Sequence, residues 1–291
     1  MGPLRVAVVI LAALIFSASA FATGTASCTF TTFNAPSGYT LNAVRGINDD
    51  GTVVGQLINN DTQAYAGFML SSNGTFTIYD APDSSMTWVY GDNAAGSSTG
   101  SYMDNGKKSA IHGFFLVGGN FTEVNHPSAK NTWLFDLNKV GAAVGSYAES
   151  TTVKGFLLEN GEYSDIAYPN AQSTYPMAMN DDNAVVGSYS SGSESSGFLW
   201  ESGTFTTINY PKAGAPYGTA LSGINNDGVI VGNRLLADGD DAFIYENGVF
   251  EKIAYAGAKY TIAGGINNNG VISGQVYMNA TDTFAFTAVC K

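Results

Sequence analysis

The sequence predicts an all-β fold: a six-bladed β-propeller of four-stranded blades, with the ring closed by the N-terminal strand. Three observations predict it. A short phrase, "GINDDGTVVG" from Gly46 and "GINNDGVIVG" from Gly223, recurs in altered spelling every 42 or 45 residues. Each interval holds four short apolar segments bounded by Gly, Asn, Asp or Pro, which is typical of propeller blades. The chain also ends one segment short of a complete repeat and begins with a segment of the missing kind.

The first residues are predicted to be a signal peptide. Arg5 supplies a positive charge, and the apolar run from Val6 to Phe16 is too short to span a bilayer. Small residues suitable for cleavage follow, up to Ala22. We therefore expect residues 1–22 to be removed. We expect residues 23–291 to form the exported domain, extracellular or periplasmic, with no membrane insertion.

The composition agrees with an exported β protein. Charged residues make up 12% of the chain and hydrophobic residues 45%, and there are 35 glycines, so a β-rich fold with a real core is expected. The formal net charge of −12 argues against nucleic acid or an anionic membrane as partner, because both require a basic surface.

Each repeat is organised around an anchor asparagine that ends its first strand. The anchors are Asn48, Asn93, Asn138, Asn180, Asn225 and Asn267. A glycine seven residues later marks the second strand, a small residue followed by Phe marks the third, and a segment such as "FTTINYP" from Phe205 forms the fourth. No segment keeps a helical period. The blades are expected at 37–82, 83–127, 128–169, 170–211, 212–256, and 257–291 together with 28–36.

The turns between these segments predict antiparallel pairing. "NDDG", "NNDG" and "NNNG" join the first and second strands, and "ENG" or "ESG" joins the third and fourth. Asn and Gly adopt positive φ at little cost, so these are short hairpin connections. Such hairpins fit a blade and disfavour a parallel β-solenoid.

The two ends of the chain are expected to share the last blade. The sixth repeat stops after its third strand, and "FTTFNAP" from Phe30 has the pattern of a fourth strand. In the fifth repeat the corresponding hairpin turn holds Asn247 and Gly248, and the equivalent positions in the closing blade are Cys290 and Cys28. We expect these cysteines to form a disulfide with Cα atoms about 4.4–6.8 Å apart, in place of the missing turn. Free thiols or an intermolecular bridge are the alternatives.

The repeat resembles that of the HAF-repeat family of secreted bacterial proteins. "GINNDGVIVG" followed by "AFIYENGVF", and "GFLWESGTFTTI", are similar to the family consensus "GIN..G.VVG...HAFLW..G" over nearly the whole exported chain. The family histidine survives only as His112, and the segment after the fourth strand reads "YP.A" instead of a Gly-Leu-rich tail. The resemblance implies a propeller and export, and it implies no activity.

Most of the repeated residues are interpreted as structural. Each anchor asparagine is expected to bond its own turn, and the phenylalanine of each third strand is expected to pack between blades. His112 and His126 lie in different repeats without a cysteine partner, and no nucleotide-binding or nucleophile-elbow motif is present. No metal and no cofactor are therefore expected.

The candidate ligand-binding residues lie where the repeats differ. The residue five before the anchor is aromatic in three successive repeats, as Trp88, Trp133 and Tyr175. These side chains are expected near the mouth of a central channel, on the face that carries the longer connections. Aromatic rings beside hydrogen-bond acceptors suit a neutral sugar, so this pattern favours glycan binding. The alternative is that the rings fill the space between blades.

Further candidates lie closer to the anchors. Tyr90 and Phe135 follow the two tryptophans, and Asp92 and Asp136 stand where other repeats have Ile or small residues. The two carboxylates come from neighbouring blades but differ by one residue in their distance from the anchor. Because successive residues of a strand point to opposite faces, we expect the two carboxyl groups not to converge.

The leading hypothesis is a secreted binding or interaction module for glycan or another cell-surface polymer. One alternative is a glycan hydrolase or lyase in which Asp92 and Asp136 act as an acid and base pair. Another is a structural protein of an envelope or extracellular matrix. Of these, the sequence favours a non-catalytic module.

Overall fold

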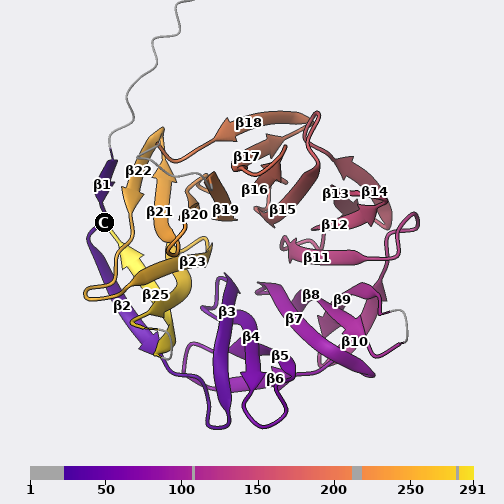
Figure 1. Ribbon diagram of the computed structural model, residues 1–291, viewed down its shortest axis with the longest axis horizontal. Helices are drawn as coiled ribbons and strands as arrows, with labels where there is room; N and C mark the ends of the chain where they lie inside the picture. Colours follow the sequence, from indigo (N-terminus) through magenta and orange to yellow (C-terminus); the bar gives the residue numbers. More distant parts are fainter. Residues whose placement is uncertain (1–22, 107–108, 212–217, 280–281) are drawn as a thin grey trace, which may run out of the picture.

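The computed structural model describes residues 23–106, 109–211, 218–279 and 282–291, which form strands and turns and contain no helix. The strands radiate around a common centre (Figure 1). The predicted signal peptide, residues 1–22, lies outside the described residues. Within them, no helix could cross a membrane.

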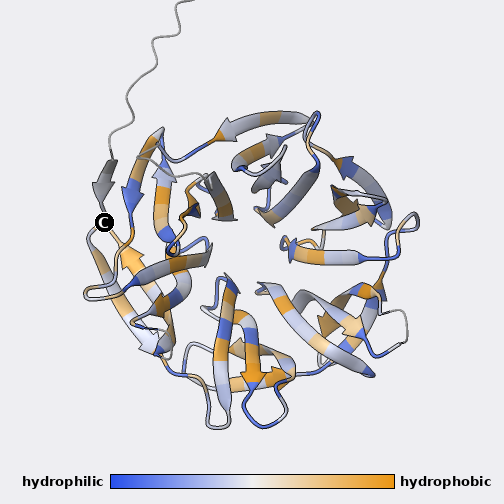
Figure 2. Ribbon diagram, in the orientation of Figure 1, coloured by the Kyte–Doolittle hydropathy of each residue, from blue (hydrophilic) through white to orange (hydrophobic). Residues whose placement is uncertain are grey.

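The strands alternate with short turns along the whole described chain. In chain order they are β1 (Thr23–Thr25), β2 (Cys28–Phe33), β3 (Tyr39–Ile47), β4 (Val53–Asn59), β5 (Tyr65–Leu70), β6 (Phe76–Tyr79), β7 (Ser84–Asn93), β8 (Ser97–Asp104), β9 (Ile111–Val117), β10 (Asn120–Val124), β11 (Thr132–Leu137), β12 (Ala143–Glu149), β13 (Thr152–Glu159), β14 (Glu162–Ile166), β15 (Ser173–Met179), β16 (Val185–Ser190), β17 (Ser195–Glu201), β18 (Thr204–Ile208), β19 (Gly218–Ile224), β20 (Ile230–Leu235), β21 (Asp241–Glu246), β22 (Val249–Lys252), β23 (Tyr260–Ile266), β24 (Val271–Tyr277) and β25 (Thr283–Cys290). Hydrophobic and hydrophilic bands alternate along strands such as β3 and β7 (Figure 2). This alternation is what half-buried strands require.

Strands of one repeat pair antiparallel in chain order, as β11 to β14 do. The first strand of each repeat lies nearest the centre and the fourth lies at the rim (Figure 1). Single parallel pairs, such as Val153 with Ser173, join the third strand of one repeat to the first strand of the next. Hydrogen bonding therefore links the strands into two continuous sheets, of 17 and eight strands. The expectation of separate four-stranded sheets did not include these links. They form because the connection between two repeats places the first strand of the later repeat beside the third strand of the earlier one.

The two ends of the chain meet in one ladder. β2 pairs antiparallel with β25, and Cys28 stands directly opposite Cys290. The predicted disulfide joins them. Their Cα atoms are 4.0 Å apart, closer than the predicted range. The neighbouring residues Ser27 and Lys291 exchange both backbone hydrogen bonds, so the cysteines occupy a non-hydrogen-bonded pair, where facing Cα atoms are closest.

A ring of buried phenylalanines forms much of the core, as expected. Phe68, Phe114, Phe156, Phe198, Phe243 and Phe286 all have 0% exposure. In each repeat this phenylalanine stands opposite the glycine seven residues after the anchor in the strand ladder. A Cβ atom added to Gly145 would lie 2.6 Å from the Phe156 ring and 2.1 Å from the backbone oxygen of Trp133. The repeated glycine is thus required by close packing between the first, second and third strands.

The first strand of each repeat contains a β-bulge three residues before the anchor. In β11, for example, Leu134 pairs with Gly145 and Asp136 with Val144, which leaves Phe135 as the extra residue. The extra residues in the six first strands are Arg45, Tyr90, Phe135, Met177, Ser222 and Gly264. A bulge bends its strand and redirects side chains. These six positions line the molecular centre.

Candidate functional site

Among the described residues, two cavities with shared lining residues lie at the centre around which the strands radiate. The hairpin cavity, of about 150 Å³, is lined by anchor asparagines such as Asn48 and Asn180, at the turns between first and second strands. The loop cavity, of about 460 Å³, is lined by residues near the starts of the first strands, such as Ala43 and Tyr175, and by Asp240 from the β20–β21 connection. Both are lined by Arg45, Tyr90, Met177 and Ser222, which therefore form the waist between them. Only the loop cavity has the volume of a typical small-molecule site.

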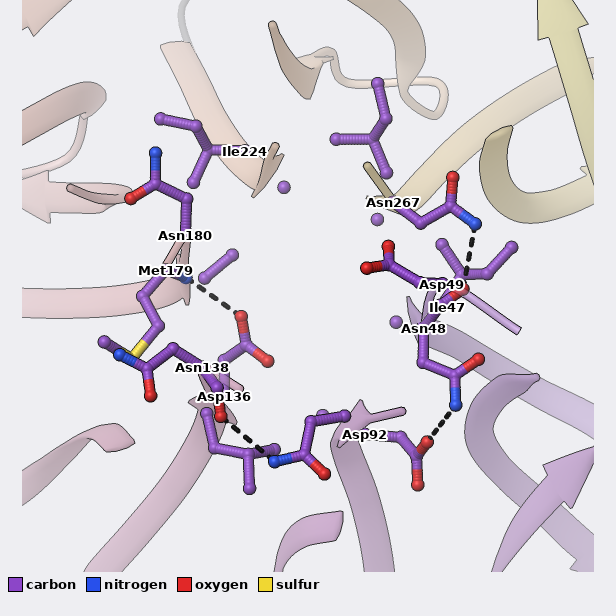
Figure 3. A pocket seen from close by; sticks show the side chains of 18 of the residues that line it. Ile47, Asn48, Asp49, Asp92, Asp136, Asn138, Met179, Asn180, Ile224 and Asn267 are labelled. Atoms are coloured by element: carbon purple, nitrogen blue, oxygen red, sulfur yellow. Dashed lines mark hydrogen bonds between the residues drawn. The ribbon is translucent and has the colours of Figure 1, made fainter. Parts of the chain in front are cut away.

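The anchor asparagines have the structural role expected of them. The Oδ1 atom of Asn267 accepts hydrogen bonds from the backbone N–H groups of Asn269 and Val271, at 3.1 and 2.9 Å, and so fixes its own turn. Its Nδ2 donates to the backbone oxygen of Asn48, 2.8 Å away in the first repeat (Figure 3). Asn180 and Asn225 donate to the following anchor in the same way. The anchors thus join each turn to the next one around the hairpin cavity.

The first anchor, Asn48, departs from this pattern because the second repeat presents Asp92 to it. Asn48 donates to Oδ1 of Asp92 at 2.5 Å instead of to the next anchor's carbonyl (Figure 3). Ser98 donates its hydroxyl to Oδ2 of the same carboxylate at 2.6 Å. Burial raises the pKa of Asp92 to about 6, although both hydrogen bonds stabilise the charged form and lower it; the nearby Asp50 raises it. Asp92 is therefore a carboxyl group that titrates near neutral pH.

Asp136 lines the same hairpin cavity. Its Oδ2 accepts a hydrogen bond from the backbone N–H of Met179 at 2.9 Å (Figure 3). Gly91 leaves room for it, because a Cβ atom there would lie 2.5 Å from Oδ1 of Asp136. Burial raises the pKa of Asp136 to about 7, against the lowering effect of its backbone hydrogen bonds, and the charge of Asp92 raises it further.

Asp92 and Asp136 both line the hairpin cavity, but their carboxyl groups bind different partners, Asn48 for Asp92 and the backbone of Met179 for Asp136 (Figure 3). The expectation that the two carboxyl groups do not converge stays a prediction. The bulges at Tyr90 and Phe135 leave the one-residue offset between Asp92 and Asp136 unchanged, because both bulges lie three residues before the anchor and precede the aspartates.

The predicted aromatic residues are divided. Tyr90 and Tyr175 line the loop cavity together with Phe135. The rings of Tyr90 and Phe135 meet edge to face, with centroids 5.2 Å apart. Trp88 and Trp133 are partly exposed on β7 and β11, and neither lines either cavity. The structure therefore brings together the two tyrosines and separates them from the tryptophans.

Sequence reasoning missed Arg45, Met177 and Ser222 at the waist. The sequence does contain a signal for these residues. The residue three before the anchor is different in every repeat, whereas the residues around it recur. The repeated threonines six before the anchor have a structural role instead. Thr132, for example, accepts the backbone N–H of His126 at 2.9 Å and fixes the preceding connection. Among the described residues no group of three or more His, Cys, Asp or Glu side chains is arranged to hold a metal ion.

Comparison with known proteins identifies the fold. No family model and no curated sequence matches the chain. Among solved structures, a gluconolactonase from Xanthomonas campestris is similar with a TM-score of 0.54 and 13% identity, covering 91% of this chain and 90% of that one. The Aleuria aurantia lectin in complex with Fucα1-6GlcNAc has a TM-score of 0.53 and 9% identity, covering 88% and 93%.

TolB from Acinetobacter baumannii has a TM-score of 0.54 and 13% identity, covering 72% of this chain and 53% of TolB, so the match spans about half of that protein. These structures are β-propellers, and at such identities the likeness concerns the fold alone. The chain has an all-β, propeller-type fold.

Proposed function

We propose that the protein is an exported, six-bladed and closed β-propeller that binds a glycan, or another cell-surface polymer, in its loop cavity. The observation that carries this proposal is the lining of that cavity. Tyr90, Phe135 and Tyr175 supply aromatic surface, and Ser188 and Asp240 supply polar groups. Aromatic faces beside hydrogen-bonding groups are what recognition of a sugar ring requires.

Two sets of contacts support the proposed closure, one at the rim and one near the centre. At the rim, β2 pairs with β25 over six residues and the Cys28–Cys290 disulfide ends the ladder. Near the centre, Asn267 of the last repeat donates to the backbone of Asn48 in the first. The disulfide also supports export, because such bonds persist in oxidising compartments.

The similar structures support a binding role without deciding it. The Aleuria aurantia lectin is a protein of this fold in complex with a fucosylated sugar. The gluconolactonase is another of this fold, so likeness alone does not separate a binder from a hydrolase. The distinction has to come from the two cavities of this chain.

Glycan-array screening of residues 23–291, followed by calorimetry on the oligosaccharides retained, tests the proposal. Tyr175→Ala removes an aromatic wall of the loop cavity and should weaken binding about tenfold, as expected for the loss of ring packing on a sugar. Tyr65→Ala, on β5 and outside both cavities, is the matched control and should bind like the wild type. Equal affinity of Tyr175→Ala and wild type would exclude the loop cavity as the site.

A second candidate is a glycan hydrolase or lyase acting at the hairpin cavity. The observation favouring it is that Asp92 and Asp136 share that cavity with pKa values of about 6 and 7, which suits an acid and base pair. The small volume of the cavity counts against it. Turnover of array-positive oligosaccharides that is lost in Asp92→Asn/Asp136→Asn, with binding retained, would establish this candidate in place of the first.

A further inference from the structure

Arg45 is a cation at the waist between the two cavities. It is the extra residue of the β3 bulge and lines both cavities. Its guanidinium carbon lies 5.6 Å from the centroid of the Tyr90 ring. Within the described part of the chain, no carboxylate lies within ion-pair distance of it. A guanidinium presents a fork of N–H donors that fits a carboxylate, and here those donors remain available.

Open volume lies beside Arg45. β3 stands between β7 and β23 (Figure 1), and the bulge residues that follow around the ring, Ser222 and Gly264, are small. Gly264 has no room for a side chain, since a Cβ atom would lie 2.8 Å from the backbone oxygen of Val44. The wall next to Arg45 is therefore backbone and short side chains, while Tyr90 forms the wall on its other side.

Asp240 is the other charged side chain lining the loop cavity. It comes from the β20–β21 connection and makes no ion pair with Arg45 among the described residues. Burial raises its pKa, so its charged form is disfavoured relative to that of an exposed aspartate. Asp240 can thus exchange hydrogen bonds with sugar hydroxyls without neutralising Arg45.

We propose that the ligand of the loop cavity carries one carboxylate, as a terminal uronic acid residue of a glycan does, and that Arg45 binds that carboxylate while Tyr90 and Tyr175 contact the sugar ring. This inference rests on the proposed glycan binding. The net charge of −12 disfavours polyanions that would extend across the surface. A single carboxylate inside the cavity lies close to Arg45. The negative charges of the outer surface act on it weakly, because salt screens charges that lie more than about 8 Å away at physiological ionic strength.

Calorimetry with matched sugars tests the inference. The probes are the methyl glycosides of glucuronic and galacturonic acid and the methyl esters of both, which keep the shape and remove the charge. Wild type should bind at least one acid about tenfold or more tightly than its ester, because the Arg45 contact is charge-assisted. Arg45→Gln should abolish this preference and Arg45→Lys should keep part of it. Arg234→Gln is the control, because Arg234 lies 5.6 Å from the Tyr210 ring and lines neither cavity.

The outcomes separate this inference from the proposed function. Equal affinity for acid and ester, or binding of neutral glycans alone, would overturn the role of Arg45 and leave glycan binding in place. Absence of binding to any acidic or neutral sugar would overturn both. Competition by inorganic phosphate as strong as by uronate would reassign Arg45 to a general oxyanion site. The acid and ester comparison needs only wild-type protein, so it stays decisive if an Arg45 variant does not fold.

Discussion

At the scale of single residues, the anchor asparagine explains why one phrase recurs. Asn225 shows both of its uses: Oδ1 accepts the N–H groups of Asp227 and Val229, and Nδ2 donates to the next anchor, Asn267. An aspartate would keep the acceptor and lose the donor, and a glycine would lose both. Only the amide serves the turn and the neighbouring repeat together. The position is therefore structural, and the carboxyl groups with raised pKa values, such as Asp92, lie at neighbouring positions that depart from the repeat.

The raised pKa of Asp136 predicts how stability depends on pH. Its folded value of about 7 exceeds the ordinary value of 3.8, so the folded protein binds this proton more tightly than the unfolded chain. The contribution of Asp136 to the free energy of unfolding is therefore fully present below pH 4 and is lost as the pH rises through 7. Asp136→Asn removes the titration. Between pH 4 and pH 8, the free energy of unfolding of the variant should fall by about 2–4 kcal/mol less than that of wild type.

Urea denaturation at pH 4, 6 and 8 measures this difference. Asp61→Asn, at an exposed turn position, is the control and should follow the wild-type profile. If Asp136→Asn loses as much stability with rising pH as wild type does, the Asp136 carboxyl group is charged in the folded protein at neutral pH, and the acid and base candidate loses its support.

At the scale of elements, the strands and hairpins could be predicted because each leaves a mark in the repeat. The glycine of the second strand recurs for a geometric reason, as Gly145 does against Phe156. The bulges could not be predicted in the same way. A bulge shifts pairing by one residue, and its extra residue is Arg45 in one repeat, Phe135 in another and Ser222 in a third. The six bulge positions face the cavities, and so the residues that line them could not be assigned from regular alternation.

Gly145→Ala should destabilise the protein by about 3 kcal/mol or more. The added methyl group would meet the backbone oxygen of Trp133 at 2.1 Å, and backbone held in a ladder cannot move aside cheaply. Gly118→Ala is the matched control, because Gly118 has a φ of 56° in an open turn with nothing near the added atom. Gly118→Ala should lower the free energy of unfolding by about 1 kcal/mol. Thermal denaturation compares them, and equal melting temperatures would contradict the packing explanation.

At the scale of the whole molecule, the meeting of the two ends could be predicted by counting. Phe30 matched the fourth-strand pattern, and Cys28 and Cys290 fell at turn positions, which fixed the register of β2 against β25. The cavities could not be obtained by counting. Each depends on unlike side chains that meet from distant repeats, such as Tyr90 and Ser222 at the waist. The repeated residues predict the strands and turns. The cavities are lined by residues that differ from one repeat to the next.

If the pairing of β2 with β25 closes the ring, the protein should fold wherever the chain ends are placed, provided that this pairing is kept. A circular permutant with Val289 joined to Thr29 through Asn-Gly, in place of Cys290 and Cys28, would replace the disulfide by a hairpin turn like the one at Asn247 and Gly248. New ends can be placed in the exposed connection at 191–194, between β16 and β17. The permutant should fold, and its melting temperature should no longer fall when a reducing agent is added.

Deletion of residues 23–33 is the opposing variant. It removes β1 and β2 and exposes the edge of β25 together with the face of Phe286 that Phe30 covers, at a centroid distance of 5.1 Å. An unpaired strand edge beside exposed core promotes aggregation, so this variant should be much less stable and should associate. Circular dichroism, thermal denaturation with and without reductant, and size-exclusion chromatography compare the three chains. A deleted chain that is monomeric and as stable as wild type would show that β2 does not close the ring, because a ring held by that strand has no other means of pairing the edge of β25.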